Sequence, residues 1–173
     1  MNRWLRLSLR IEATTRTLVP AGLAFLFALA GSIPLSAAPT MLLKPLLPLT
    51  AVYYWSLYSP NLLPAPMAFL LGLLVDILSG APLGVCAAMF TLVHAVLCQQ
   101  RRFLIDKSFE LNWLGFALVT TGGFAMVWLL TSILNGGPVA MLGLLFQATT
   151  TVAVFPLAFW LLHRCHVAIV SPA

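Results

Sequence analysis

Asp76 is the residue whose type and position most suggest chemistry. It is the only acidic residue within the long apolar stretches of the chain, and an isolated carboxylate in a membrane span is costly. Gly72 and Gly80 lie four residues before and after it, on the same stripe of a helix. Small residues on one stripe let another backbone approach closely. We therefore expect Asp76 to be a polar pin on a helix-contact face rather than a group that reaches headgroup water.

A partner for Asp76 is available in Lys44. If the spans are drawn correctly, both residues lie within about 6 Å of the same membrane interface, by the rise of a helix. Pairing with Lys44 would keep the carboxylate ionised, whereas burial without a cation would leave it protonated. The sequence leaves both states open. A proton relay would need a chain of acids, so one acid supports proton-coupled transport only weakly.

Two small groups of residues could be imagined as metal ligands. His94 and Cys98 are four residues apart on one predicted helix, and His163, Cys165 and His166 close another. Structural zinc needs four ligands, and each group falls short of that number. We expect His94 to be an ordinary hydrogen-bonded histidine, and we predict no metal and no cofactor.

Nucleophilic catalysis is also poorly supported. Ser79 is not part of a GxSxG elbow, and no histidine lies near it in sequence, although a serine nucleophile needs an activating base. A glycine-rich phosphate loop is absent as well. We therefore predict that the protein is not an enzyme.

The composition defines the elements that must position these residues. The chain has 173 residues, of which 61% are hydrophobic and only 8% are charged, whereas soluble domains carry roughly a quarter charged residues. Four long stretches of the chain lack charged residues, and each is long enough for one or two spans of about 20 residues. The composition thus predicts a polytopic membrane protein. The net charge is +5. The basic residues flank apolar runs, which is typical of membrane orientation rather than nucleic-acid binding.

We predict an all-α fold, a polytopic bundle of six transmembrane helices. A basic amphipathic segment at residues 1–17 precedes the transmembrane domain at 18–163, and a short cytoplasmic tail at 164–173 follows it. The first apolar stretch is longer than a signal-peptide core, so we expect an uncleaved span there. The six helices are expected at residues 18–38, 42–58, 62–80, 83–100, 112–134 and 140–163.

Basic residues fix the expected orientation. With both termini in the cytoplasm, Lys44 is the only basic residue on the outer side, and the other eight are cytoplasmic, as the positive-inside rule requires. The longest polar connection, at residues 99–112, would then be cytoplasmic. Its basic residues Arg101, Arg102 and Lys107 form a candidate contact surface for a cytoplasmic protein.

The stretch FLLGLLVDILSGAPLG, residues 69–84, resembles the signature of the MreD family of bacterial rod shape-determining membrane proteins. Tyr54-Trp55 and Pro60 also resemble the segment that leads into this signature. The resemblance runs from about residue 46 to 163. Residues that match the motif are Gly72, Asp76, Gly80, Pro82 and Gly84.

This resemblance implies a non-enzymatic subunit of the machinery that elongates the cell wall, located in the bacterial inner membrane. It implies association with MreC, and work beside MreB, RodA and a penicillin-binding transpeptidase. It also implies a fold similar to the substrate-binding membrane component of energy-coupling-factor transporters. The five motif residues would then have a structural or partner-contact role, with membrane lipid around them and no small-molecule substrate.

A competing interpretation is a substrate-binding subunit of a vitamin transporter, because a six-helix layout can hold a ligand. Such a site needs several convergent polar groups in an apolar pocket. The spans offer few candidates, namely Thr120, Thr121, Asn135, Gln147, Thr149, Thr150 and Thr151. Neighbouring genes for wall synthesis or for transporter ATPases would discriminate between the two functions.

Overall fold

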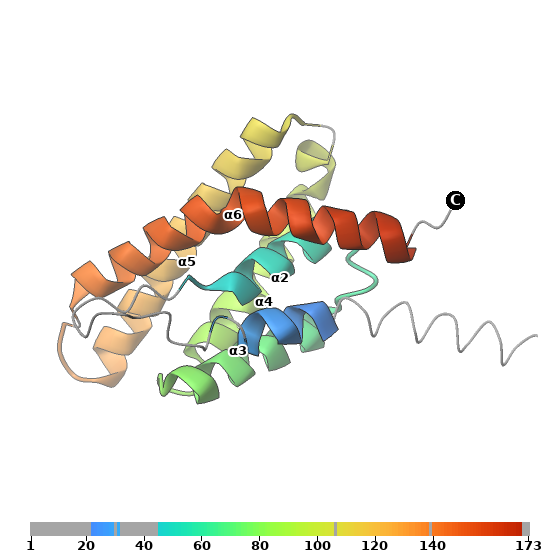
Figure 1. Cartoon of the computed structure of the whole chain (residues 1–173). Coiled ribbons are helices and arrows are strands. Elements are labelled where there is room, and N and C mark those ends of the chain that lie inside the picture. The colour runs from blue at the N-terminus through green and yellow to red at the C-terminus, as the bar shows by residue number, and fades with distance from the viewer. Residues whose placement is uncertain (1–21, 30, 32–44, 106, 139, 171–173) are drawn as a thin grey trace, which may run out of the picture.

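The computed structural model of the chain describes residues 22–29, 31, 45–105, 107–138 and 140–170, and within them the fold is helical, without a strand (Figure 1). Residues 22–29 form a first helical segment. It is followed by α2 (Leu47–Tyr58), α3 (Ala65–Ser79), α4 (Val85–Leu104), α5 (Phe109–Leu134) and α6 (Met141–Val170). The predicted all-α class is confirmed.

Several helix ends differ from the predicted ones. α4 continues to Leu104 and α5 begins at Phe109, so the polar stretch predicted as a loop at residues 99–112 is mostly helical. Gln and Arg are good helix formers, which explains why α4 does not end where the apolar residues end. α6 likewise continues through Arg164 to Val170, well into the predicted tail.

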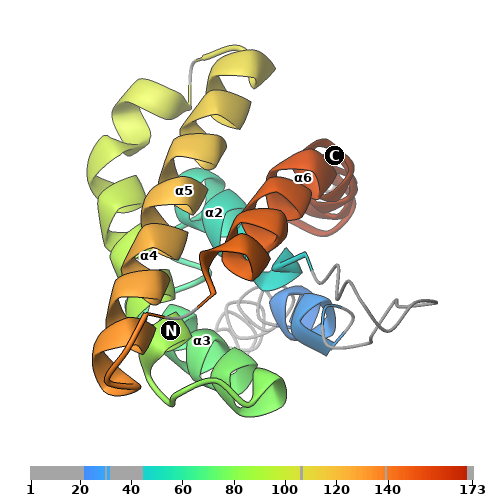
Figure 2. The same cartoon turned by 90° about the vertical axis from the view of Figure 1, so that its left-hand side faces the viewer.

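α2 is the central helix of the molecule. Ten of its twelve residues are buried, and it packs against α4 on one side and α6 on the other (Figure 2). Its largest buried side chains are Tyr53, Tyr54 and Trp55. The Tyr53 ring meets Phe116 of α5 and Phe155 of α6 edge to face, at centroid distances of 5.1 and 5.6 Å. These aromatic contacts make α2 the core around which the longer helices pack.

Only two of the described helices are long and apolar enough to cross a membrane. They are α5 and the Met141–His166 part of α6, each 26 residues long. α3 is a shorter apolar helix of 15 residues, and α2, at about 18 Å, is shorter than the hydrocarbon layer. The expected total of six membrane spans therefore stays a prediction.

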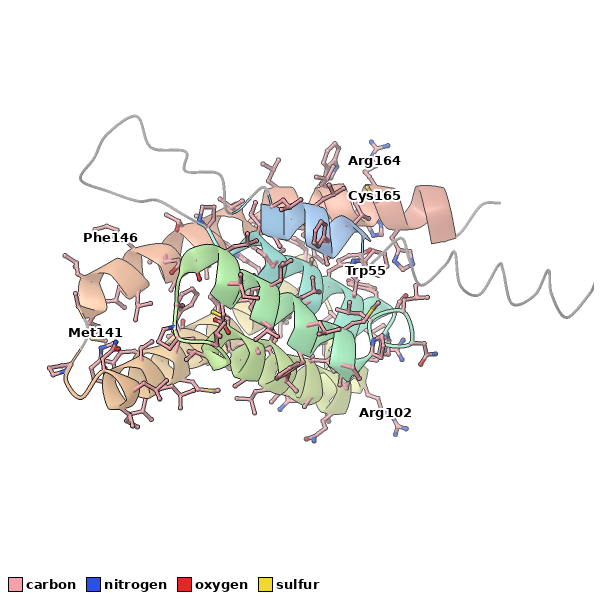
Figure 3. The ribbon with its side chains drawn as sticks, turned by 90° about the horizontal axis from the view of Figure 1, so that it is seen from below. Trp55, Arg102, Met141, Phe146, Arg164 and Cys165 are labelled. Atoms are coloured by element: carbon pink, nitrogen blue, oxygen red, sulfur yellow. The ribbon has the colours of Figure 1, made fainter. Side chains whose placement is uncertain are left out.

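Basic side chains mark one end of the molecule. Figure 3 shows Arg102 and Arg164 at the same end of the bundle, with Met141 at the opposite end. Between them, α5 and α6 carry no charged residue from Leu111 to His163. This distribution is the one that the positive-inside rule describes for a bundle with its basic end in the cytoplasm.

Candidate functional site

Asp76 is the centre of a buried polar junction between α3 and α4. Its side chain is 0% exposed. Oδ2 accepts hydrogen bonds from the backbone N–H of Gly84 (2.8 Å) and Ala87 (3.4 Å), and Oδ1 accepts one from Cys86 (3.0 Å). The carboxylate therefore binds the free N–H groups at the start of α4. We call this arrangement, Asp76 with those three amides, the carboxylate lock.

The local sequence explains why the lock forms. Gly80 ends α3 in the left-handed conformation (φ 68°), and Gly84 precedes α4 with φ 99°. Glycine adopts both conformations without steric cost, so the chain reverses within five residues and returns α4 along α3. Gly84 has no side chain with which to cap α4, and the Asp76 side chain takes that place at the positive end of the helix dipole.

Gly72 lets the two helices meet. A Cβ atom at this position would lie 2.4 Å from Ala87 Cα and 2.6 Å from the carbonyl oxygen of Cys86. Both neighbours are backbone atoms that no rotamer change can move. At Gly72 the backbones of α3 and α4 therefore approach closely, one helical turn before the lock.

The other two motif residues lie in the turn. The space beside Gly80 is open, since an added Cβ would meet nothing within 4 Å. Within the described chain the role of Gly80 is conformational, and its place on a helix-contact or partner interface stays a prediction. Pro82 contributes its carbonyl, which accepts a hydrogen bond from Val85 N–H (3.4 Å). Thus all five motif residues build one helical hairpin.

Lys44, the expected ion-pair partner of Asp76, lies outside the described residues, as do the basic segment at residues 1–17 and part of the helix expected at 18–38. The carboxylate does not depend on a cation for its hydrogen bonds. Its contacts to the described part of the chain are backbone amides on α4 and the turn before it.

Arg101 has an intramolecular function that differs from the expected loop contact. Its Nε donates to the carbonyl of Leu57 (2.8 Å) and its Nη2 to the carbonyl of Tyr58 (3.3 Å). These are the last carbonyls of α2, where a cation is favoured by the helix dipole. Arg102 and Lys107 are exposed instead. The predicted contact of these three residues with a cytoplasmic protein stays a prediction.

The opposite end of α2 is also held by a side chain from another helix. Thr151 of α6 accepts a hydrogen bond from Leu46 N–H, the residue before α2, at 2.9 Å. Both ends of this short buried helix are therefore satisfied by side chains, Thr151 at the start and Arg101 at the end. Such partners are needed because helix ends leave unpaired backbone groups.

The three histidines of the chain all contact consecutive residues of α2. Tyr54 Oη lies 3.3 Å from His163 Nδ1, the Trp55 ring stacks on His166 with centroids 5.3 Å apart, and Ser56 Oγ lies 2.8 Å from His94 Nδ1. His94 also approaches Cys98 through Nε2 at 3.6 Å. Among the described residues, no group of three or more His, Cys, Asp or Glu side chains could hold a metal ion. Sequence spacing did not indicate Tyr54 or Ser56, because their partners are distant in the chain.

Ser56 and His94 form a hydroxyl–imidazole pair of the kind that nucleophilic enzymes use. Ser56 is 0% exposed and His94 is 7% exposed. The second ring nitrogen of His94 contacts a cysteine rather than an orienting acid. The pair is buried and forms a polar link between α2 and α4.

A cavity of about 210 Å³ lies beside the carboxylate lock. Its lining comes from Ala28 and Gly31, from α2 to α6, and from the segments that lead into α2 and α4. Val75 and Cys86, the neighbours of the lock, form part of one wall. Among the described residues of the lining, the polar side chains other than Cys86 are those of Ser79, Thr131 and Gln147.

Comparison with known proteins identifies one family. The sequence model described as rod shape-determining protein MreD matches residues 14–165, which is most of the chain. An uncharacterised protein of Rickettsia prowazekii (strain Madrid E), RP566, is 29% identical over 100 residues, covering 58% of this chain and 56% of that protein. The chain thus aligns with little more than half the length of this relative. No solved structure matches the chain.

Proposed function

Because this chain belongs to the MreD family of rod shape-determining proteins, we propose that it is a non-enzymatic membrane subunit of the complex that elongates the cell wall. In this proposal it binds MreC and works beside MreB, RodA and a penicillin-binding transpeptidase. The observation that carries the proposal is the family match over residues 14–165. Membership of the family implies a function in rod shape, and the partners are what we add.

The carboxylate lock supports a scaffolding function. Gly72 and Asp76 lie at the α3–α4 contact and are buried, so they shape the hairpin rather than touch a partner. The hairpin presents large apolar side chains outward: Ile77 is 62% exposed and Leu83 is 69% exposed. We propose that the lock holds this turn in one shape, as a preformed surface for a partner in the same membrane.

The contacts of the buried polar groups support the proposal that the protein is not an enzyme. Asp76, Arg101 and Thr151 bind helix ends, and the histidines bind α2. Each of these groups is already engaged in holding helices together. A catalytic centre would instead need such groups to converge on a space that a substrate can enter.

The orientation that we propose has both termini in the cytoplasm. The described basic side chains that are exposed, Arg102, Lys107 and Arg164, lie near the α4–α5 connection and the carboxyl end of α6. The carboxylate lock and the α3–α4 turn then lie toward the outer face. A partner with a periplasmic domain, such as MreC, would meet the chain from that side.

The alternative, a vitamin-binding transporter subunit, receives less support. Pockets for ligands of drug size measure about 300–1,000 Å³ and place several polar groups around the ligand. The cavity beside the lock is smaller, at about 210 Å³, and its lining is mostly apolar. It does not match the convergent polar site that a vitamin requires.

Deletion of the gene in its host tests the proposed function. We expect the cells to lose their rod shape and become round, and to recover when the intact chain is supplied from a plasmid. A deletion strain that keeps its rod shape but needs a vitamin in the medium would show that the alternative is correct.

A further inference from the structure

We propose that the cavity beside the carboxylate lock holds the end of one hydrocarbon chain of a membrane lipid. The proposal goes beyond the scaffolding function and does not depend on it. It rests on the chemistry of the lining, the size of the space and the exposure of its walls.

The lining offers almost nothing to a polar ligand. The Ser79 hydroxyl donates to the carbonyls of Val75 and Asp76, and the Thr131 hydroxyl donates to those of Val127 and Trp128. Both hydroxyl protons are therefore used within their own helices. The side-chain amide of Gln147 makes no hydrogen bond to the described residues. A buried water needs two to four polar partners, so one free amide favours an apolar occupant over water.

The volume limits the shape of that occupant. An apolar cavity of about 150 Å³ is sufficient for benzene, and the present cavity is larger, at about 210 Å³. It is still below the range of about 300 Å³ and more that whole drug-sized molecules occupy. A slender chain that enters with its end only, and leaves the rest of its molecule outside, satisfies both limits.

The walls indicate how such a chain would enter. Leu78 is 42% exposed and Ser79 is exposed, so the space reaches the surface near the end of α3. Met89 is 0% exposed and Phe124 is 6% exposed, so they form the inner wall. The outer surfaces of α5 and α6 carry exposed leucines, with Leu118 77% exposed and Leu142 66% exposed. In a membrane, the medium beside these surfaces is lipid hydrocarbon, which supplies the occupant.

Photochemical cross-linking tests the proposal. The full chain would be reconstituted in phosphatidylcholine vesicles in which a small fraction of the lipid carries a diazirine near the end of one acyl chain. After irradiation, peptide mass mapping locates the attached lipid. We expect adducts at exposed Leu118, which bulk lipid contacts, and also at Met89 or Phe124, which bulk lipid cannot reach. Adducts confined to exposed residues in the unaltered chain would overturn the proposal.

Two neighbouring leucines provide a matched pair of variants. Leu144 lines the cavity, whereas Leu145 does not and is 48% exposed. Leu144→Phe should reduce adducts at Met89 and Phe124 by about tenfold relative to those at Leu118, because a close-packed interior has no room for both ring and chain. Leu145→Phe should leave the ratio unchanged.

Thr131→Leu, which fills the cavity from a different helix, provides a second test if Leu144→Phe does not fold. Helix content measured by circular dichroism, together with adducts at Leu118, shows whether each variant is folded. If folded Leu144→Phe and Thr131→Leu both keep the wild-type ratio, the lipid does not occupy this cavity. The vesicles contain no partner protein, so failure here leaves the proposed elongation function unaffected.

Discussion

Asp76 stabilises the fold as a side-chain cap that comes from a different helix. An N-terminal cap is usually supplied by the residue just before the helix, but that residue is glycine in α4. The glycine is needed for the turn, so the acceptor comes from α3, eight residues earlier. A buried carboxylate is tolerated because three amides solvate it.

Two substitutions of Asp76 should therefore separate the contribution of its side-chain shape to the unfolding free energy from that of its hydrogen bonds. Asp76→Asn turns one acceptor into an NH₂ group that faces a backbone N–H, which should cost about 1–3 kcal/mol of unfolding free energy. Asp76→Leu leaves all three amides without an acceptor and should cost clearly more. Unfolding in detergent by increasing denaturant measures both. Glu110→Gln, at an exposed position, is the control for loss of one negative charge and should change little. Equal stability of Asn, Leu and wild type would contradict the lock.

Gly72 is predicted to be the glycine least tolerant of a methyl group. Gly72→Ala would place Cβ 2.4 Å from the backbone of Ala87, so the helices must separate, at a cost of about 1–3 kcal/mol. Gly122→Ala is the matched control, because nothing lies within 4 Å of the added atom. It should be neutral or stabilising, since alanine favours a helix by about 1 kcal/mol over glycine. If both substitutions had the same effect on the melting temperature, close approach at Gly72 would not matter.

A hydrogen bond links α5 to α6 at a position where a proline interrupts the backbone hydrogen bonding of α6. Pro156 lies inside α6 and has no N–H to donate to the carbonyl four residues earlier, that of Val152. This free carbonyl accepts a hydrogen bond from Trp113 Nε1 of α5 at 3.1 Å. The proline thereby creates the acceptor that links two long helices.

A double-mutant cycle tests this link. Trp113→Phe should destabilise the wild type because Val152 loses its partner, whereas Pro156→Ala restores the helical donor. In the Pro156→Ala background, Trp113→Phe should cost less, with a coupling energy of about 0.5–3 kcal/mol. Additive effects in denaturant unfolding would show that the two residues act independently.

Helix positions and type could be predicted from sequence because charged residues, prolines and glycines interrupt long apolar runs. The end of α4 could not, because Gln99 to Arg102 are polar but favour helix. The motif also indicated that Asp76 has a partner. It did not identify the partner as backbone amides, since these carry no sequence signal. The binding of Arg101 to α2 and of Ser56 to His94 joins residues 44 and 38 positions apart, which only the fold brings together.

In the whole molecule, the short buried helix α2 is enclosed by longer helices (Figure 2), and the exposed side chains of Arg102 and Arg164 lie toward one end (Figure 3). We predict that reporter fusions at residue 105 and at the carboxyl terminus are cytoplasmic, and that a fusion at Gly137 is external, because of the eight-to-one basic asymmetry. An external reporter at residue 105 would mean that the number of spans before residue 105, α4 included, is odd. The short helix α2 would then be the span to remove.

Copurification with MreC tests the proposed partner surface. The tagged chain would be isolated from its host in mild detergent and the associated proteins identified by mass spectrometry. We expect MreC in the wild-type sample, less of it with Asp76→Asn, and least with Asp76→Leu, while Glu110→Gln retains the wild-type amount. Absence of MreC from the folded wild-type sample, or the same amount with wild type and folded Asp76→Leu, would contradict a partner surface held by the carboxylate lock.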